Sequence, residues 1–352
     1  MPTMKAVVFH EFSGPEQLVV DAVPRPEPGP SDVLVRVEAA GICYHDLLDR
    51  AGKLPEARPG RILGHEIAGE VVEVGEQVVG VAPGQRVVLY QRVYCGRCRH
   101  CLNGRQDLCR DSAVFGAGRD GGYAEYVRAP AVNAMSLPDA VDWVAGALAV
   151  CPIGTSIRAA LGIAELSAGD TVLVTGASGG LGLHQIQVAR SVGARVIAVT
   201  SSEAKAAAIR AVGADEVVVS PDLRFSGAVW RLTDKQGVDV VLENVVSGTL
   251  GESLRSLGAH GLAVVLGNVD VRALEINPGL IIGRRLRLAG SGNATYDDVS
   301  RGLRLLSAGQ ITAQVARVLP FPRAAEGHAL LEARGAIGRV VLRGWQPDPD
   351  TN

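Results

Sequence analysis

The first part of the chain contains short valine-rich runs separated by turn residues. These runs lie at residues 5–9, 32–42, 66–75 and 85–90. Their length is that of β-strands, and proline and glycine punctuate the segments between them. Short strands at this spacing predict an irregular antiparallel, barrel-like domain, which we place at residues 1–152.

The pattern changes near residue 152, where apolar runs begin to alternate with alanine-rich helical stretches. Residues 171–176 have the pattern of a strand and 182–193 that of a helix, and a second such pair follows at once. This alternation indicates βαβ units and a doubly wound parallel sheet. We therefore predict an α/β protein whose second domain covers residues 153–290, with residues 291–352 returning to the first domain.

Composition and charge narrow the class of protein. The net charge is only −2, from 35 basic and 37 acidic residues, which gives no basic face for nucleic acid or a membrane surface. The N-terminal apolar run is too short for a signal peptide, and no stretch reaches the ~18 uninterrupted apolar residues of a membrane helix. We expect a cytoplasmic protein, and in that reducing compartment cysteines are more often metal ligands than disulfides.

Four of the six cysteines lie close together in the segment YCGRCRHCLNGRQDLC. They are Cys95, Cys98, Cys101 and Cys109. Zn²⁺ binds four thiolates tetrahedrally, and cysteines at such spacing can wrap a short loop around one ion. The alternative is four free or oxidised thiols in an exposed loop. A site with four thiolates has no open position, so this segment predicts a structural metal lobe rather than a catalytic one.

Cys43, His65 and Cys151 are the other candidate metal ligands. Taken singly, each of the three residues could have a purely structural role. A lone cysteine, for example, is usually a small buried hydrophobic residue. Two thiolates and one imidazole nevertheless form a recognised open zinc site, with the fourth position free for water or substrate. The presence of the four-cysteine lobe favours this second interpretation.

These motifs resemble those of the zinc-type medium-chain dehydrogenases/reductases, the alcohol dehydrogenase superfamily, over essentially the whole length. Cys-x-x-Asp at Cys43, Gly-His-Glu at His65, the four-cysteine lobe and the later Cys151 occur in the family's order. The segments CYHDLL, CPIGTSIRAAL, VTGASGGLG and LGNVD look similar to a subgroup that includes acryloyl-CoA reductases. The resemblance implies a GroES-like catalytic domain, a Rossmann domain and two zinc ions per chain, one catalytic and one structural.

The resemblance also assigns roles around the catalytic metal. Glu66 matches a carboxylate that can approach the metal, and Asp46 matches the one that orients the ligand histidine. The family's alcohol dehydrogenases usually carry Ser or Thr two residues after the first ligand cysteine, whereas this chain has His45, preceded by Tyr44, and Leu48 stands at the usual relay histidine. His45 is either a general acid/base or a residue that shapes the substrate pocket.

A glycine-rich turn between a strand and a helix marks the cofactor loop. The residues that we expect to hold the pyrophosphate are Gly176, Ser178, Gly179, Gly180, Leu181 and Gly182. Backbone N–H groups at the start of such a helix bind phosphate, and the flanking strand and helix supply the context that a glycine motif alone lacks.

The end of the next strand suggests which dinucleotide is used. An NAD enzyme would place a carboxylate here to bind the ribose 2′-hydroxyl, but this chain has Ser201, Ser202 and Lys205. Hydroxyls and an ammonium group accept a 2′-phosphate, so NADPH is favoured. Glu203 in the same segment argues against this, because its carboxylate would repel the phosphate. The resemblance adds further cofactor contacts at Thr155, Val245, Gly267, Asn268 and Arg339.

Three functions remain open from the sequence. The first is hydride transfer between nicotinamide and a carbonyl/alcohol substrate, and the second is NADPH-dependent reduction of an activated C=C bond, as in an enoyl or enal substrate. The third is a non-catalytic nucleotide-binding protein on the same fold. We expect a small-molecule substrate and, from the resemblance, a homo-oligomer (dimer or tetramer) joined through residues 286–292.

Overall fold

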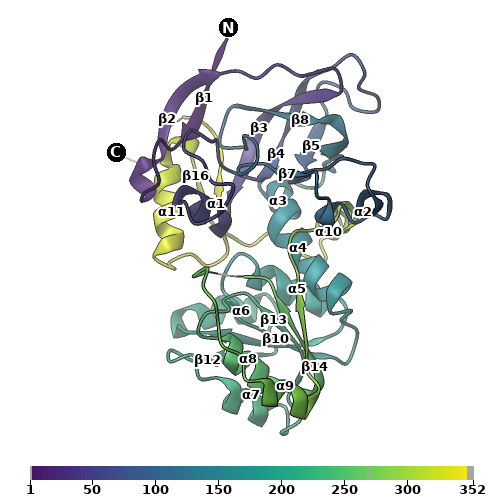
Figure 1. The fold of residues 1–352 in the computed structure, drawn as a ribbon, viewed down its shortest axis with the longest axis vertical. Coiled ribbons are helices and arrows are strands. Elements are labelled where there is room, and N and C mark those ends of the chain that lie inside the picture. Colours follow the sequence, from purple (N-terminus) through teal and green to yellow (C-terminus); the bar gives the residue numbers. More distant parts are fainter. Residues whose placement is uncertain (1, 268, 347–352) are drawn as a thin grey trace. The chain divides into compact units, whose positions relative to one another are not determined.

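A computed structural model describes residues 2–267 and 269–346 and divides the chain into two compact units (Figure 1). The first unit holds the chain up to Cys151, the segment Thr295–Gly309 and the residues from Val315 onward. The second holds Pro152–Ala294 and Gln310–Gln314. The sequence placed everything after residue 290 with the first domain, whereas the structure groups residues 291–294 and Gln310–Gln314 with the second. There, Gln314 N donates to His184 Nε2 at 3.0 Å.

The first unit is built on a seven-stranded sheet in the order β16-β17-β3-β4-β5-β9, with β8 also paired to β3. Two further sheets have two strands each, β1-β2 and β6-β7. The strands of the whole unit are β1 (Thr3–Val8), β2 (Val19–Pro24), β3 (Asp32–Ile42), β4 (Glu66–Val74), β5 (Arg86–Leu89), β6 (Arg92–Val93), β7 (Ala113–Val114), β8 (Tyr126–Pro130), β9 (Ala134–Ser136), β16 (Val315–Leu319) and β17 (Arg339–Leu342). Its helices are α1 (Tyr44–Arg50), α2 (Arg99–Leu102), α3 (Trp143–Leu148), α10 (Tyr296–Ser307) and α11 (Ala324–Glu332).

The C-terminal strands complete this sheet. β17 pairs antiparallel with β3, so that Val340 lies opposite Ile42, and in Figure 1 the yellow C-terminal elements lie among the purple N-terminal strands. On its other side β3 pairs antiparallel with β4, with Gly41 opposite Glu66. The starts of β17 and β4 therefore flank the end of β3, immediately before Cys43.

The second unit is a six-stranded parallel sheet in the order β12-β11-β10-β13-β14-β15. The strands are β10 (Thr171–Val174), β11 (Arg195–Thr200), β12 (Glu216–Val219), β13 (Val238–Glu243), β14 (Leu257–Val265) and β15 (Arg287–Gly290). The helices are α4 (Gly154–Ile157), α5 (Gly182–Ser191), α6 (Ala206–Ala211), α7 (Ser226–Leu232), α8 (Leu250–Ser256) and α9 (Pro278–Arg284).

This strand order is that of a Rossmann fold, in which the chain reverses direction across the sheet between its first and fourth strands. Here those strands are β10 and β13, which pair directly. Ligands of open α/β sheets bind at the carboxyl ends of the strands at such a reversal. The predicted alternation of strands and helices is confirmed, and both parts of the predicted fold class are present.

The helical run from Trp143 to Ile163 contains π-helical turns around Cys151 and Pro152. By length and composition this run could cross a membrane, although 72% of its most apolar window is buried inside the protein. Arg158 interrupts the run, which is why counting uninterrupted apolar residues did not single it out. Burial marks it as a core helix.

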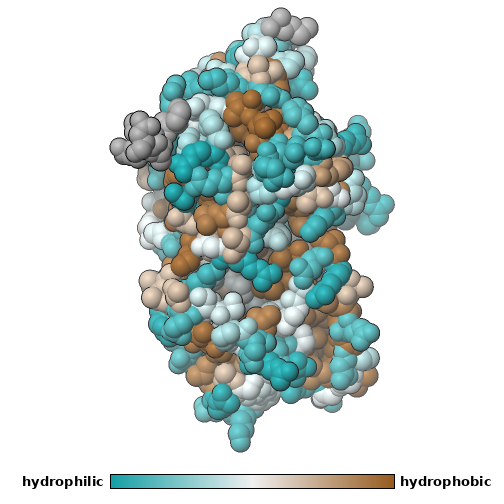
Figure 2. Space-filling model, turned by 90° about the vertical axis from the view of Figure 1, so that its left-hand side faces the viewer, coloured by the Kyte–Doolittle hydropathy of each residue, from teal (hydrophilic) through white to brown (hydrophobic). Residues whose placement is uncertain are grey.

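The surface drawn in Figure 2 shows hydrophobic residues in separate groups among hydrophilic ones.

Candidate active site

The four-cysteine lobe brings its sulfur atoms together within one short segment. The Sγ atoms of Cys95, Cys98, Cys101 and Cys109 all lie within 4.8 Å of one another. Cys98 Sγ lies 3.5 Å from Cys101 Sγ, which lies 3.9 Å from Cys95 Sγ. Four thiolates about 2.3 Å from one zinc ion would lie about 3.8 Å apart, so the lobe fits a structural zinc ion.

The chemistry of these thiols agrees with their geometry. All four are free cysteines. Hydrogen bonds from the backbone N–H groups of Arg97 and Cys98 lower the pKa of Cys95 to about 6, which favours its thiolate, whereas burial and the hydrogen bond with Cys98 raise the pKa of Cys101 to about 12. The thiolate is the form that binds metal.

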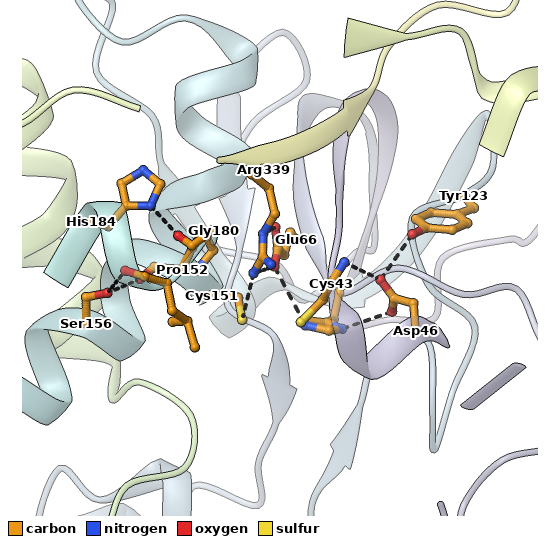
Figure 3. Close-up of polar contacts among 12 residues, drawn as sticks. Cys43, Asp46, Glu66, Tyr123, Cys151, Pro152, Ser156, Gly180, His184 and Arg339 are labelled. Atoms are coloured by element: carbon orange, nitrogen blue, oxygen red, sulfur yellow. Dashed lines mark hydrogen bonds and ion pairs between the residues drawn. The ribbon is translucent and has the colours of Figure 1, made fainter. Parts of the chain in front are cut away.

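A second cluster forms from residues that are far apart in the sequence. Ligand atoms of Cys43, His65, Glu66 and Cys151 all lie within 4.8 Å of one another. Figure 3 shows Cys43, Cys151 and Glu66 converging from different elements of the fold. Two thiolates and one imidazole at this spacing fit a zinc ion with one position open to solvent or substrate. The structure thus brings together the three residues that the sequence proposed as one ligand set.

Each ligand is placed by a different local structure. Cys43 is the N-cap residue of α1, directly after the end of β3. His65 precedes the first residue of β4 and follows Gly64, whose φ of +95° favours glycine. Cys151 lies in the π-helical turn that ends near Pro152. π-turns inside helices occur frequently at functional sites because they re-aim a side chain.

Asp46 connects two of the ligands. Its Oδ2 accepts a hydrogen bond from Cys43 N at 2.8 Å, and its Oδ1 lies 3.3 Å from His65 Nδ1. The first contact is one half of a capping box at the start of α1. A carboxylate so close to Nδ1 favours a proton on that nitrogen and leaves Nε2 for a metal, the usual role of a carboxylate behind a ligand histidine.

The ligands shift one another's pKa values because they lie close together, with His65 buried and the two cysteines partly buried. A hydrogen bond from the Cys151 thiol, together with the charges of Arg339 and His65, holds the pKa of Cys43 well below its usual value. The same bond raises the pKa of Cys151. Burial lowers the pKa of His65, but the charges of Asp46 and Cys43 outweigh it and raise this pKa well above its usual value. The cluster therefore favours one thiolate even before a metal is considered.

Glu66 and Arg339 form a buried ion pair beside the cluster. Arg339 Nε and Nη2 lie 3.1 Å and 2.5 Å from the two carboxylate oxygens of Glu66, and Nη2 lies 3.8 Å from Cys151 Sγ (Figure 3). Gly41 makes room for the pair, because a Cβ there would lie 2.0 Å from Glu66 Oε2. The resemblance assigned Arg339 to a cofactor phosphate, whereas the structure places its guanidinium on Glu66.

His45 and Tyr44 lie at the start of α1. His45 is exposed, and its ring centroid is 6.4 Å from that of His65. Tyr44 is half-buried and packs against the hydrophobic core of the first unit. His45 is thus the more exposed residue of this pair. Leu48 is buried and offers no polar group.

The glycine-rich loop of the second unit forms a tight turn before α5. Gly176 has φ of +56°, and a Cβ on Gly182 would lie 2.6 Å from Gly176 O, so both positions need glycine. Gly179 N donates to Gly176 O at 3.0 Å. Gly180 O bonds His184 Nδ1 at 2.6 Å, and Ser156 Oγ lies 3.4 Å from Leu181 O. With Ser178 also buried, the loop is held tightly at the start of α5.

Further predicted cofactor residues lie at the carboxyl ends of neighbouring strands. A Cβ on Gly176 would lie 3.1 Å from Val245 Cγ2, and one on Gly267 would lie 1.7 Å from Asn244 O, so these segments touch. Thr155 is buried on α4. Asn268 lies outside the described residues.

The residues proposed to select the cofactor follow β11. Ser201 is exposed, and Ser202 and Lys205 are half-buried around the short helical turn Glu203–Lys205. Glu203 is itself exposed. Two hydroxyls and an ammonium group therefore lie where an NAD-specific carboxylate would be expected.

Two buried polar residues of the first unit, Tyr123 and His328, and one of the second, Glu243, were not singled out as site residues from the sequence. The hydroxyl of Tyr123 donates to Asp46 Oδ2 at 3.0 Å, and its oxygen lies 3.4 Å from His328 Nε2. Glu243, at the end of β13, accepts from Thr175 Oγ1, Thr249 Oγ1 and the backbone N–H groups of Val245 and Val246. The contacts of Tyr123 and the Thr175–Glu243 bond join distant segments, which local spacing in the sequence does not reveal.

Comparison with known proteins agrees with this geometry. Residues 29–139 match the alcohol dehydrogenase GroES-like domain family, and residues 180–308 match the zinc-binding dehydrogenase family. The chain is 34% identical to an acryloyl-coenzyme A reductase of Sulfurisphaera tokodaii, over 97% of this chain and 100% of that protein. It is also 34% identical to an NAD-dependent alcohol dehydrogenase of Saccharolobus solfataricus, over 96% of this chain and 99% of that protein.

A solved structure shows the same fold. The crystal structure of AibC superposes with a TM-score of 0.91 at 42% sequence identity, covering 97% of this chain and 96% of that one. The family predicted from the cysteine and glycine motifs is thereby confirmed. The chain belongs to the zinc-binding dehydrogenase family and is an oxidoreductase of the zinc-type medium-chain dehydrogenase/reductase superfamily.

Proposed function

We propose that this chain is an NADPH-dependent enzyme that transfers hydride between nicotinamide and a carbonyl/alcohol substrate at a zinc ion held by Cys43, His65 and Cys151. The observation that carries the proposal is the meeting of these three side chains, with ligand atoms within 4.8 Å of one another. Three protein ligands leave a position for the substrate oxygen. When bound, zinc supplies a Lewis acid that polarises that oxygen, and the nicotinamide supplies the hydride.

The chain's own residues prepare this site in two ways. Asp46 fixes the orientation of His65 and of the Cys43 backbone. The Arg339 guanidinium offsets the negative charge that Glu66 and the two thiols bring into a buried region. Without a cation, so many acidic groups would be costly to bury together.

Proton delivery falls to His45 or to water in this proposal. His45 is exposed and lies beside His65, so it can reach a group bound near the ligands. A histidine in this place can donate to or accept from the substrate oxygen, or shape the pocket around it. The hydroxyl relay of ordinary alcohol dehydrogenases is not present at positions 45 and 48, where His45 and Leu48 stand.

The observation that favours a second candidate is the presence of His45 and Leu48 in place of the hydroxyl relay. The second candidate is reduction of an activated C=C bond in an enoyl thioester or enal. In that reaction hydride adds to the β-carbon, and the negative charge that develops on the conjugated oxygen needs a nearby electrophile. A relay to an alcohol oxygen is then unnecessary. The full-length similarity to an acryloyl-coenzyme A reductase supports this candidate, and the similarity to an alcohol dehydrogenase supports the first.

We also infer two zinc ions per chain, a preference for NADPH, and a homo-oligomer. The four-cysteine lobe would hold the second ion. Ser201, Ser202 and Lys205 support binding of a 2′-phosphate. β15 is the last strand of its sheet and carries Leu288, which is 39% exposed. Pairing with the same strand of a second copy would cover the open edge of β15 and this leucine.

One experiment tests the proposal and separates its two forms. Purified protein with NADPH is assayed against matched aldehydes, ketones, enals and enoyl-CoA esters, after its zinc content has been measured. Turnover of aldehydes or ketones supports the first form, and turnover confined to enals or enoyl thioesters supports the second. Binding of NADPH without turnover of any substrate would favour the non-catalytic alternative and contradict the proposal.

A further inference from the structure

A chain of buried polar side chains continues from Asp46 away from the metal ligands. The Tyr123 hydroxyl lies 3.0 Å from Asp46 Oδ2 and 3.4 Å from His328 Nε2. His328 Nδ1 lies 3.2 Å from Arg50 Nη1. All four side chains are at most 1% exposed, and they come from α1, α11 and the segment before β8. None of the cysteine or glycine motifs includes Tyr123 or His328.

The chemistry of the groups fixes the direction of every hydrogen bond in this chain. A guanidinium can only donate, so Arg50 donates to His328 Nδ1, and the ring proton must then sit on Nε2. Nε2 faces the Tyr123 oxygen, so the tyrosine proton is donated to Asp46. Burial, with the charge of Arg50, lowers the pKa of His328 to about 3, which keeps the ring neutral as this arrangement requires.

The far end of the chain is anchored at the surface of the first unit. Arg50 also donates to Ser13 O at 3.1 Å and forms an ion pair with Glu332, whose side chain is 40% exposed. Each nitrogen of the buried guanidinium thus has a partner, which holds the group in one place. Because Arg50 can only donate, each hydrogen bond in the series from Arg50 to Asp46 points the same way, and Asp46 accepts the last one.

The backbone around Tyr123 binds directly to the segment that carries His65. Tyr123 N donates to Leu63 O at 3.0 Å, and Gly122 N donates to Gly64 O at 2.9 Å. A Cβ on Gly64 would lie 2.4 Å from the Tyr123 ring, so the ring rests against the residue before His65. Tyr123 therefore contacts both the turn that presents His65 and the carboxylate that orients its ring.

We propose that Tyr123 is a positioning residue for the metal ligand His65, acting through Asp46, and that His328 and Arg50 set the direction of its hydroxyl. The Asp46 carboxylate then accepts from two donors, Cys43 N and the Tyr123 hydroxyl, and its Oδ1 faces His65 Nδ1 at 3.3 Å. With these bonds made, Asp46 holds the imidazole in one tautomer and one orientation. The inference rests on the proposed function, because its effect is on a metal held by Cys43, His65 and Cys151.

The test replaces Tyr123 by phenylalanine, which keeps the ring and removes only the hydroxyl. Protein loaded with zinc is mixed with a colorimetric chelator, and the rate of zinc release from each site is followed. The four-cysteine lobe is an internal reference within the same chain. Tyr126→Phe is the matched control, since the Tyr126 ring is half-buried under Arg25 at 4.6 Å, on β8. We expect release from the three-ligand site to be about tenfold faster in Tyr123→Phe and unchanged in the control.

A second variant, His328→Gln, keeps a polar side chain but disturbs the hydrogen-bonded series one residue further from Asp46. At 3.4 Å the contact of His328 with Tyr123 is the longest link, so the expected acceleration is smaller, about twofold to threefold. The double variant should release zinc as fast as Tyr123→Phe alone, because without the hydroxyl His328 has no connection to Asp46. Cobalt-loaded Tyr123→Phe should show an altered visible spectrum only for the three-ligand site.

Three results would overturn the inference: an unchanged release rate in Tyr123→Phe, equal acceleration at both metal sites, or additive effects in the double variant. The second would mean that the hydroxyl only stabilises the fold. The proposed function fails separately, and is recognised in the unmodified protein. If that protein holds zinc only in the four-cysteine lobe, the metal proposal itself is wrong. If it holds two ions and Tyr123→Phe changes nothing, only the positioning role is lost.

Discussion

The two cysteine clusters of the first unit use the same kind of ligand but are assembled in opposite ways. The lobe takes all four thiols from residues 95–109, a loop that contains α2 and the helical turn Gln106–Leu108 between the short strands β6 and β7. The other cluster joins a helix N-cap, the residue before β4 and a π-helical turn. Buried partners, Asp46 and the Glu66–Arg339 pair, surround it.

This contrast has a physical meaning. A lobe without a core of its own depends on the metal for its folding free energy, as small metal-binding domains do. A cluster whose ligands are placed by the sheet and helices is organised before the metal arrives, so the metal there adds chemistry. Loss of the metal should therefore affect stability at the first site and activity at the second.

The largest expected effect is that of Cys43→Ser on activity. A serine hydroxyl keeps its proton at neutral pH, so the metal loses one of its three ligands. We expect turnover to fall about a thousandfold, roughly 4 kcal/mol in the activation free energy. Zinc content should fall from two ions to one, with the temperature of unfolding nearly unchanged. Full activity in this variant would contradict the assignment of the open site.

Cys98→Ser makes the matched change in the lobe and should have the reverse signature. Loss of the structural ion removes about 2–3 kcal/mol of stability, which lowers Tm by roughly 5–10 °C in a unit of this size. Calorimetry and zinc analysis measure both quantities. Activity per remaining catalytic ion should fall far less than in Cys43→Ser. A thousandfold loss here would show that the two sites are not separate in function.

Ser201→Asp lies in the second unit and should leave both metal sites unchanged. A carboxylate at this position repels a 2′-phosphate and binds a 2′-hydroxyl, so NADPH should lose about tenfold in kcat/KM relative to NADH. Zinc content and Tm serve as the controls. An unchanged preference would mean that the ribose contact lies elsewhere on the segment after β11.

The sequence predicted more of this protein where the relevant residues are close together. The strand–glycine loop–helix of the Rossmann fold and the four-cysteine lobe follow from spacing over a few residues, and the structure shows both. Residue types and the family resemblance also singled out Cys43, His65 and Cys151. The contact of Arg339 with Glu66 was not predicted, because nothing in the sequence says that β17 pairs with β3 and brings the two residues together.

Tyr123 and His328 could not have been found from the sequence at all. A tyrosine near two glycines and a lone histidine in a helix carry no local signal, and their roles arise only when α11 packs near α1. The sequence alone determined the strand and helix periods, the metal-binding loop and the ligand types, because these depend on residues a few positions apart. Only the tertiary structure decided which buried charges and hydrogen-bond donors meet, because a buried polar group must find its partner wherever the fold brings one.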